Sequence, residues 1–304
     1  MKTIAFVGAG QMGQGMLASL ARNGFAVTVH DISPANLAQA VSAGATAAGS
    51  LSEAVEASDV VVTMLPTAAA VEQVYLGATG ILAHAKPGTL CIDMTTVPPA
   101  LSISLSQALA ERHIRFLDSP VSGGGPRARS GTLTLMVGGG ARDFEDALPV
   151  LQAMGSEIVH VGPAGGGSAA KIANNVIAAA SMVATSEAFQ IARAYGVDPV
   201  TLTKIFETSS SNTWVLHNMH PVPGVRAGSP SSRNYEPGFT TDLMIEVLEL
   251  IQRTANDGRV PLTLVPAMHQ LWQLASNHGF GSKDCTSVYE FIGIGADKAA
   301  GGSA

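Results

Sequence analysis

The sequence predicts an α/β domain with a parallel sheet, followed by an all-helical domain, with one long helix joining the two. Short apolar runs of strand type alternate with helical patterns as far as residue 162. A helical pattern of about 28 residues then begins at Ser168, and no strand-like alternation follows it. We expect domains at 1–165 and 166–300, a long helix at about 168–195 and a disordered tail at 301–304.

The expected strands of the first domain are apolar runs of four to six residues. They cover 3–7, 26–30, 59–64, 90–93, 114–118, 133–137 and 158–161. Helical patterns lie between them, at 16–22, 37–43, 52–58, 70–75, 99–111 and 143–154. This alternation is typical of a parallel sheet with crossover helices.

The second domain contains helical patterns separated by short connections. After the long helix they cover 199–207, 214–218, 241–254, 264–278 and 287–292. Residues 221–237 carry four prolines and match neither helix nor strand. A connection of this length without regular structure is typical of a functional loop.

The first strand runs directly into a glycine pattern that is typical of dinucleotide-binding domains. The pattern consists of Gly8, Ala9, Gly10, Gln11, Met12 and Gly13. Gly8 permits the tight turn, Gly10 lets backbone amides approach a pyrophosphate, and Gly13 lets the next helix pack closely on the sheet. A strand before the pattern and a helix after it support this interpretation, so we expect these residues to bind the cofactor.

Asp31 ends the second expected strand and favours NAD over NADP. A carboxylate at this place accepts hydrogen bonds from the adenosine ribose and repels a 2′-phosphate. The alternative is a turn residue ahead of Ser33 and Pro34.

Composition excludes several classes of protein. The chain has 304 residues, 46% of them hydrophobic, and a formal net charge of −6 without any basic run, so it offers nucleic acid no binding surface. Two cysteines are too few for a disulfide framework or a zinc cage, which suits the cytoplasm and predicts no metal. The apolar stretch 172–192 contains Asn174, Asn175, Glu187 and Gln190 and is expected to be a buried helix rather than a membrane span.

Two further segments suggest a site for a small carboxylate beside a proton donor. Ser122, Gly123 and Gly124 offer a hydroxyl and backbone amides that no side chain blocks, which together can hold a carboxylate. A tight turn is the alternative reading of such glycines. Lys171 and Asn175 lie four residues apart, and therefore on one face of the long helix.

Oxidation of an alcohol needs a group that takes the hydroxyl proton while hydride leaves the carbon. Lys171 is the ionisable side chain in the first turns of the long helix, and burial would lower its pKa toward neutrality. The alternative is a lysine that extends from the helix into solvent.

These segments resemble the β-hydroxyacid dehydrogenase family over essentially the whole chain. The matching blocks are the glycine pattern at 8–13, residues 118–124 continuing to 131–133, residues 162–171 with the two asparagines, and residues 239–244. The segments 221–225 and 234–235 resemble the branch of the family that acts on 3-hydroxyisobutyrate. The resemblance implies a Rossmann domain, a connecting helix and a helical domain, commonly in a homodimer or homotetramer, and NAD or NADP as cofactor.

The resemblance also implies roles for individual residues. It makes Lys171 catalytic, with Asn175, Ser122, Gly123 and Gly124 around the carboxylate and hydroxyl of the substrate. Leu65, Pro66 and Thr96 would border the nicotinamide and ribose, with ordinary loop structure as the alternative. Apart from the resemblance, Trp214 and Phe239 are candidates for lining a small apolar substrate pocket, with core packing as the alternative.

One departure from the family pattern concerns the block after Phe239. The family has a lysine and an aspartate where this chain has Glu246 and Val247. Because an anion beside a pyrophosphate is repelled, Glu246 is expected to weaken NAD binding.

The expected function is the NAD-dependent oxidation of a small 3-hydroxy acid, with 3-hydroxyisobutyrate giving methylmalonate semialdehyde as the first choice. Serine, 3-hydroxypropionate and tartronate semialdehyde are alternative substrates. A dinucleotide-binding scaffold without catalysis is the competing class, because of Glu246 and Val247, and imine reduction ranks third.

Overall fold

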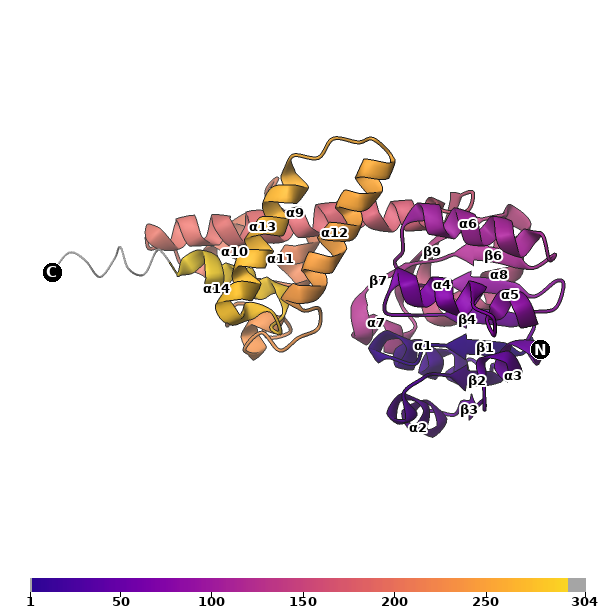
Figure 1. Ribbon diagram of the computed structural model, residues 1–304. Helices are drawn as coiled ribbons and strands as arrows, with labels where there is room; N and C mark the ends of the chain where they lie inside the picture. The colour runs from indigo at the N-terminus through magenta and orange to yellow at the C-terminus, as the bar shows by residue number, and fades with distance from the viewer. Residues whose placement is uncertain (1, 295–304) are drawn as a thin grey trace. The chain divides into compact units, whose positions relative to one another are not determined.

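The computed structural model describes residues 2–294, so the tail expected at 301–304 lies outside the described part. The chain divides into two compact units, residues 1–172 and 173–304. The division falls inside helix α9 (Gly166–Ala194), whereas the sequence places the boundary between residues 165 and 166. Figure 1 labels the elements of both units.

The first unit is a sheet covered by helices on both faces. Its strands are β1 (Ile4–Val7), β2 (Val27–His30), β3 (Thr46–Ala47), β4 (Val60–Thr63), β5 (Leu90–Asp93), β6 (Arg115–Asp118), β7 (Val121–Ser122), β8 (Leu133–Gly139) and β9 (Gly155–Gly162). They are ordered β3-β2-β1-β4-β5-β6-β8-β7, and β9 pairs with β8. The strands from β3 to β6 are parallel, which confirms the expected Rossmann-type α/β class.

The prediction of a parallel sheet is wrong for its last part. β8 runs antiparallel to both β6 and β7. The direction reverses because the connection from β7 to β8 holds only the short helix α7 (Gly124–Ser130) and the left-handed Gly131, with φ 72°. A parallel connection needs a longer crossover, such as α8 (Ala141–Met154) between β8 and β9.

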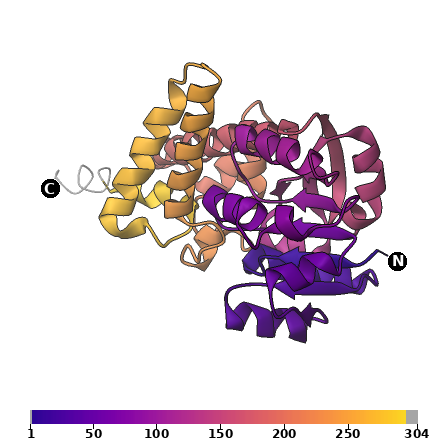
Figure 2. The same ribbon diagram turned by 45° about the vertical axis from the view of Figure 1, so that its right-hand side comes forward.

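Strand residues alternate between two hydrophobic cores, one on each face of the sheet. Figures 1 and 2 show the helices of the first unit on both faces of the sheet. Ile4 and Phe6 point into the core formed with α1 (Gln11–Arg22), α2 (Pro34–Ser42), α7 and α8. Ala5 and Val7 point into the core formed with the helices of the opposite face. Those helices are α3 (Leu51–Glu56), α4 (Ala68–Leu76), α5 (Ile81–His84) and α6 (Pro99–Ala110). Because both faces are buried, each strand reads as a continuous apolar run.

Helix α9 begins at Gly166, two residues before the expected start at Ser168. Ser168 does not cap the helix, because it lies within the first turn and is fully buried. Instead, Asp118 of β6 caps the helix. Its carboxylate accepts hydrogen bonds from the amides of Gly165 and Ser168, at 2.8 and 2.7 Å.

The second unit is helical, as expected. It contains the rest of α9, α10 (Pro199–Glu207), α11 (Trp214–Asn218), α12 (Thr241–Asp257), α13 (Leu264–Ala275) and α14 (Val288–Gly293). One core forms where Phe189, Leu216 and Tyr289 meet, and Phe206 packs edge-on against Phe189 at 5.3 Å between ring centroids. The expected loop at 221–237 contains a single 3-10 turn, Pro230–Arg233.

Each unit contains one of the two cysteines, and both thiols are buried. Cys91 lies in β5 and Cys285 in a 3-10 turn (Cys285–Ser287) before α14, and neither side chain is exposed. Burial raises the pKa of both thiols well above the usual range.

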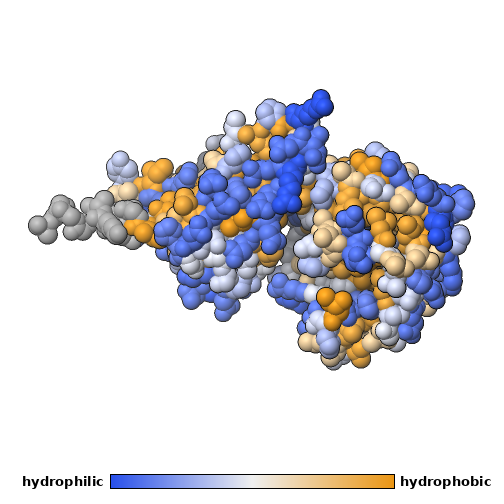
Figure 3. All heavy atoms as spheres, in the orientation of Figure 1, coloured by the Kyte–Doolittle hydropathy of each residue, from blue (hydrophilic) through white to orange (hydrophobic). Residues whose placement is uncertain are grey.

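The described helices include none that could cross a membrane. Hydrophilic and hydrophobic residues are interspersed over the surface shown in Figure 3.

Candidate active site

The glycine loop after β1 has the geometry that a dinucleotide-binding turn needs. Gly8 has φ 95°, and a Cβ there would lie 2.2 Å from the carbonyl oxygen of Met64. A Cβ at Gly13 would lie 2.1 Å from the carbonyl oxygen of Gly8, so glycine is required for close packing. A Cβ at Gly10 would have no neighbour within 4 Å, and no side chain caps α1 at this residue. The space beside Gly10, Gln11 and Met12 therefore fits a pyrophosphate at the N-terminus of α1.

Asp31 ties the glycine loop to the end of β2. One carboxylate oxygen accepts a hydrogen bond from the amide of Ala9 at 2.6 Å, and the other accepts from the amide of Ser33 at 2.7 Å and from Asn36 at 3.2 Å. Asp31 is half-buried, and the bond to Ser33 shows that it also acts as a turn residue. Its two oxygens retain acceptor capacity for ribose hydroxyls, so the turn role and the proposed cofactor role are compatible.

Asp93, at the end of β5, holds the segment that carries Leu65 and Pro66. Its Oδ1 accepts hydrogen bonds from the hydroxyls of Thr63 and Thr95, both at 2.7 Å. The hydroxyl of Thr95 accepts in turn from the amide of Leu65 at 3.1 Å. Burial raises the pKa of Asp93 to about 6, and its Oδ2 has no partner in the described chain. This network places Leu65 and Thr96 at the carboxyl edge of the sheet, where α/β sheets bind ligands.

Ser122, Gly123 and Gly124 lead from β7 into α7 and lie close to the dinucleotide loop. Gly123 and Gly124 have φ 134° and 70°, conformations that favour glycine. Helix α7 packs on α1, and a Cβ at Gly125 would lie 4.0 Å from Cγ of Gln11. Since no side chain caps α7, the amides of Gly124 and Gly125 can donate hydrogen bonds to an anion. The segment is therefore both a turn and a candidate carboxylate site.

Lys171 lies on the second turn of α9 and is half-buried. Burial lowers its pKa to about 8. Within residues 2–294, no hydrogen bond or ion pair holds its ammonium group. Asn175 is half-buried one turn later on the same helix. A half-buried amine with a pKa of about 8 and no partner among the described residues has the properties of a proton-transfer group.

Four expected site residues belong to the second unit, so they are not among those that the first unit brings together: Asn175 and also Trp214, Phe239 and Glu246. Trp214 begins α11, and its side chain is 52% exposed. Phe239 is half-buried, and the buried carboxylate of Asp284 accepts hydrogen bonds from the amides of Gly238 and Phe239, both at 3.1 Å. Glu246 is exposed on α12.

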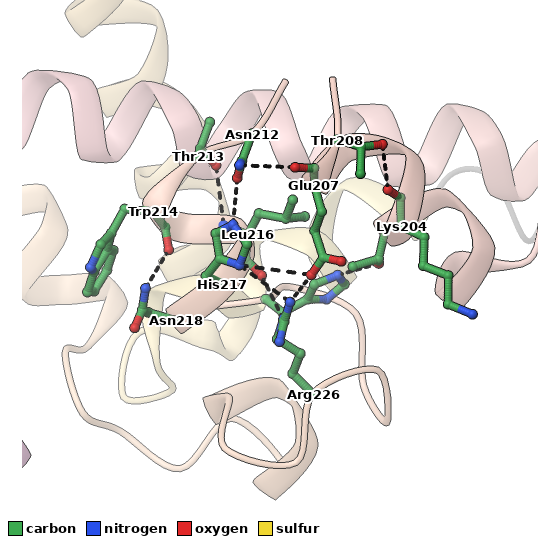
Figure 4. A network of polar contacts seen from close by, with 12 residues as sticks. Lys204, Glu207, Thr208, Asn212, Thr213, Trp214, Leu216, His217, Asn218 and Arg226 are labelled. Carbon is green, nitrogen blue, oxygen red and sulfur yellow. Dashed lines mark hydrogen bonds and ion pairs between the residues drawn. The ribbon is translucent and has the colours of Figure 1, made fainter. Parts of the chain in front are cut away.

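Polar contacts fix the 221–237 loop against α10 and α11 (Figure 4). Arg226 forms an ion pair with Glu207 and donates from Nε to the carbonyl oxygen of Leu216 at 3.2 Å. His217 contacts Asn212 at 2.5 Å. Tyr235 donates its hydroxyl to the carbonyl oxygen of Pro221 at 3.1 Å, so the two ends of the loop are joined.

Asp93 and Asp118 were not predicted as site residues, although both are buried at the ends of neighbouring strands and paired in register. A recognisable signal was present, because each carboxylate is the last residue of an apolar strand run. Such a charge is expected either to face a ligand or to accept hydrogen bonds from loops at that edge.

Models of two protein families match almost the whole chain. Residues 3–162 match the NAD-binding domain of 6-phosphogluconate dehydrogenase, and residues 165–292 match the NAD-binding domain of NADP-dependent 3-hydroxyisobutyrate dehydrogenase.

Individual proteins are similar over the same length. The mitochondrial 3-hydroxyisobutyrate dehydrogenase of Mus musculus is 39% identical over 289 residues, which cover 95% of this chain and 86% of that protein. The NAD-dependent L-serine dehydrogenase of Pseudomonas aeruginosa is also 39% identical and is covered to 98%, with 96% of this chain. The structure of Mycobacterium tuberculosis 3-hydroxyisobutyrate dehydrogenase with L-serine has a TM-score of 0.89 and 34% identity, with coverage of 96% of this chain and 99% of the other.

The fold, the dinucleotide loop and these similarities define an NAD-dependent oxidoreductase that acts on a CH–OH group. The chain belongs to the β-hydroxyacid dehydrogenase family and is close to its 3-hydroxyisobutyrate dehydrogenases.

Proposed function

We propose that the protein oxidises 3-hydroxyisobutyrate to methylmalonate semialdehyde with NAD, and that Lys171 takes the hydroxyl proton. The observation that carries this proposal is the half-buried amine of Lys171, which has a pKa of about 8 and no partner in the described chain. Neutral amine is then present near physiological pH, so the group can accept a proton in one direction and donate it in the other.

The rest of the proposed site binds and orients the two reactants. Ser122, Gly123 and Gly124 hold the carboxylate through a hydroxyl and backbone amides, and Asn175 orients the substrate hydroxyl or the lysine. NAD supplies the hydride acceptor when it is bound. Leu65, Pro66 and Thr96 border its nicotinamide end, while the 8–13 loop and Asp31 hold the pyrophosphate and ribose. Trp214 and Phe239 line the apolar side of the substrate.

L-serine is the second candidate substrate, and a specific similarity favours it. The serine dehydrogenase of P. aeruginosa is as similar to this chain as the mouse 3-hydroxyisobutyrate dehydrogenase is. Both substrates present a carboxylate and a primary hydroxyl at the same separation, and they differ in a methyl against an ammonium group. The loop whose ends are joined by Tyr235 and Pro221 contains the segments that resemble the 3-hydroxyisobutyrate branch, which supports our first choice.

The test is an absorbance assay of NADH formation from 3-hydroxyisobutyrate, L-serine, 3-hydroxypropionate and glycerate, with NAD and NADP compared. We expect the highest kcat/KM for 3-hydroxyisobutyrate with NAD. Lys171→Ala should abolish turnover, whereas Lys204→Ala, which removes an exposed lysine of α10, should leave it unchanged. A higher kcat/KM for serine would replace the substrate, and no activity on any acid would favour a non-catalytic scaffold.

A further inference from the structure

We propose that Asp118 is a positioning residue, which sets the separation between the amine of Lys171 and the amides that hold the substrate carboxylate. This inference rests on the proposed function and goes beyond it, because Asp118 touches neither substrate nor cofactor in the proposed site. It acts through the two segments that do.

The first segment is the start of α9. Asp118 is 1% exposed, and each of its two carboxylate oxygens accepts one amide hydrogen bond, from Gly165 at 2.8 Å and from Ser168 at 2.7 Å. Ser168 is further fixed by its hydroxyl, which contacts that of Ser102 at 3.0 Å. Lys171 follows Ser168 by three residues, which is nearly one helical turn. The position of the amine therefore depends on this cap.

The second segment is the chain that leaves β6. Asp118 is the last residue of β6, and Ser122 lies four residues later, at the end of β7. The amide of Ser119 donates to the carbonyl oxygen of Asp93 at 2.6 Å, which fixes the direction of this chain. Asp118 thus anchors the helix that carries the Lys171 amine, and it also begins the segment that leads to the proposed carboxylate site.

Close packing leaves the carboxylate little freedom to move. A Cβ at Gly138 would lie 2.4 Å from Oδ1 of Asp118, and a Cβ at Gly167 would lie 2.5 Å from its carbonyl oxygen. Helix α9 can pack this closely on β6 and β8 because positions 138 and 167 are both glycine. A longer or shorter side chain at position 118 would shift the helix or leave its amides without acceptors.

The charge of Asp118 also has identifiable surroundings. Asp93 is its register partner on β5, and the two carboxylates repel each other. Burial raises the pKa of Asp118, and the amides of Gly165 and Ser168 oppose that rise. The hydrogen bonds to α9 therefore favour the ionised form that caps the helix.

The experiment compares Asp118→Asn and Asp118→Ala with Asp198→Ala. Asp198 caps α10 in the same manner, by accepting the amide of Thr201 at 2.8 Å, but it lies in the second unit on a helix that carries no expected site residue. We would measure kcat, KM for the acid, Kd for NAD, the melting temperature and the pH dependence of kcat/KM.

We expect Asp118→Asn to lower kcat roughly 10- to 100-fold, because small displacements of reacting groups are costly, while Kd for NAD changes less than about threefold. The rising limb of kcat/KM should also move to higher pH, since a displaced amine is better hydrated. Asp118→Ala should show both effects more strongly, and Asp198→Ala should lower the melting temperature without either effect.

Two outcomes would separate the inference from the function on which it rests. If Lys171→Ala is inactive but Asp118→Asn keeps the wild-type kcat and pH limb, Asp118 has a structural role alone and the inference fails. If Lys171→Ala retains full activity, the proposed function itself fails. A loss of melting temperature of the same size in Asp118→Asn and Asp198→Ala, with kcat unchanged, would likewise refute positioning.

Discussion

Different interactions hold two irregular segments of this protein in place. At the carboxyl edge of the sheet, buried aspartates accept hydrogen bonds from backbone amides and hydroxyls, and glycines allow the segments to pack closely. In the 221–237 loop, the partly exposed ion pair of Arg226 with Glu207 acts beside hydrogen bonds of buried side chains, among them that of Tyr235 to Pro221. Replacing a buried group is more disruptive than replacing a screened surface pair. We therefore expect the sheet edge to determine catalysis and the loop to adjust substrate preference.

The largest expected effect comes from Lys171. Lys171→Ala should lower kcat by roughly 10²- to 10⁴-fold, because the hydroxyl proton loses its acceptor. In the wild-type protein, oxidation should become faster as the pH rises through about 8, since the amine loses its proton there. Steady-state rates over a pH series would test both statements. The series should extend at least about one pH unit to either side of that pKa. A rate that does not change over this range would contradict the role of Lys171 as the base.

Asp93 tests whether buried charge at the sheet edge is costly. Its folded pKa of about 6 lies above the ordinary value of 3.8, so the protonated form is favoured by folding. Ionisation of Asp93 therefore lowers the free energy of unfolding. This loss is absent below pH 3.8, grows between pH 3.8 and 6, and reaches on the order of 3 kcal/mol above pH 6. Asp93→Asn should therefore raise the free energy of unfolding at pH 8 but not at acidic pH. Urea titrations at acidic pH and at pH 8 would measure this difference. An equal change in the free energy of unfolding at both pH values would exclude the electrostatic cause.

Two glycines of the dinucleotide loop should respond differently to alanine. Gly13→Ala places a methyl group against the Gly8 carbonyl and should cost about 1–3 kcal/mol of stability. Gly10→Ala meets open space, so it should leave the melting temperature unchanged while raising Kd for NAD roughly tenfold. Thermal melts with NAD titrations separate the effects. An unchanged Kd for NAD in Gly10→Ala would show that the space at Gly10 is not used by the cofactor.

In the 221–237 loop, Arg226→Met should have a smaller effect. The ion pair with Glu207 is partly exposed, so we expect a loss of about 1 kcal/mol that becomes smaller at high salt. KM for the acid should rise a few fold, with Kd for NAD unchanged. Arg226→Lys keeps the charge without the planar geometry and serves as the control. A large fall in kcat would mean that the loop participates in catalysis.

The smallest expected effect is that of Glu246→Lys. The side chain is exposed, so solvent screens its charge, and we expect NAD to bind about threefold more tightly. Glu246→Gln should give an intermediate value. Isothermal titration would test the series, and an unchanged Kd throughout would refute the electrostatic explanation.

The sequence predicted those parts of the fold that repeat over many residues or require glycine. The alternation of apolar runs predicted β1, β2, β4, β5 and β6, and the structure confirms Pro199–Glu207 and Trp214–Asn218 as helices. It did not predict β3 or β7, which have two residues each, because no periodicity can be recognised over that length. Helix α7 was missed because Gly124, Gly125 and Pro126 are typical of a turn.

Site residues could be predicted from local motifs but not from long-range contacts. Lys171 and the glycines could be proposed as site residues because their neighbours in sequence form a pattern. Asp118 caps a helix that begins almost fifty residues later, with a sequence separation of 50 to Ser168. Nothing near either residue specifies that contact, since it arises from the packing of α9 on the sheet. The start of α9 was therefore assigned to Ser168, the nearest residue with capping chemistry.

The placement of the two thiols offers a direct way to follow how the protein denatures. Cys91 reports on the first unit and Cys285 on the second, and both are inaccessible to an alkylating reagent until the surrounding structure opens. Pulsed labelling along a urea gradient, read by mass spectrometry of the two cysteine peptides, would record each unit's opening separately. Coincident labelling midpoints for the two cysteines would indicate one cooperative transition. Different midpoints would show which unit is less stable, without any introduced label.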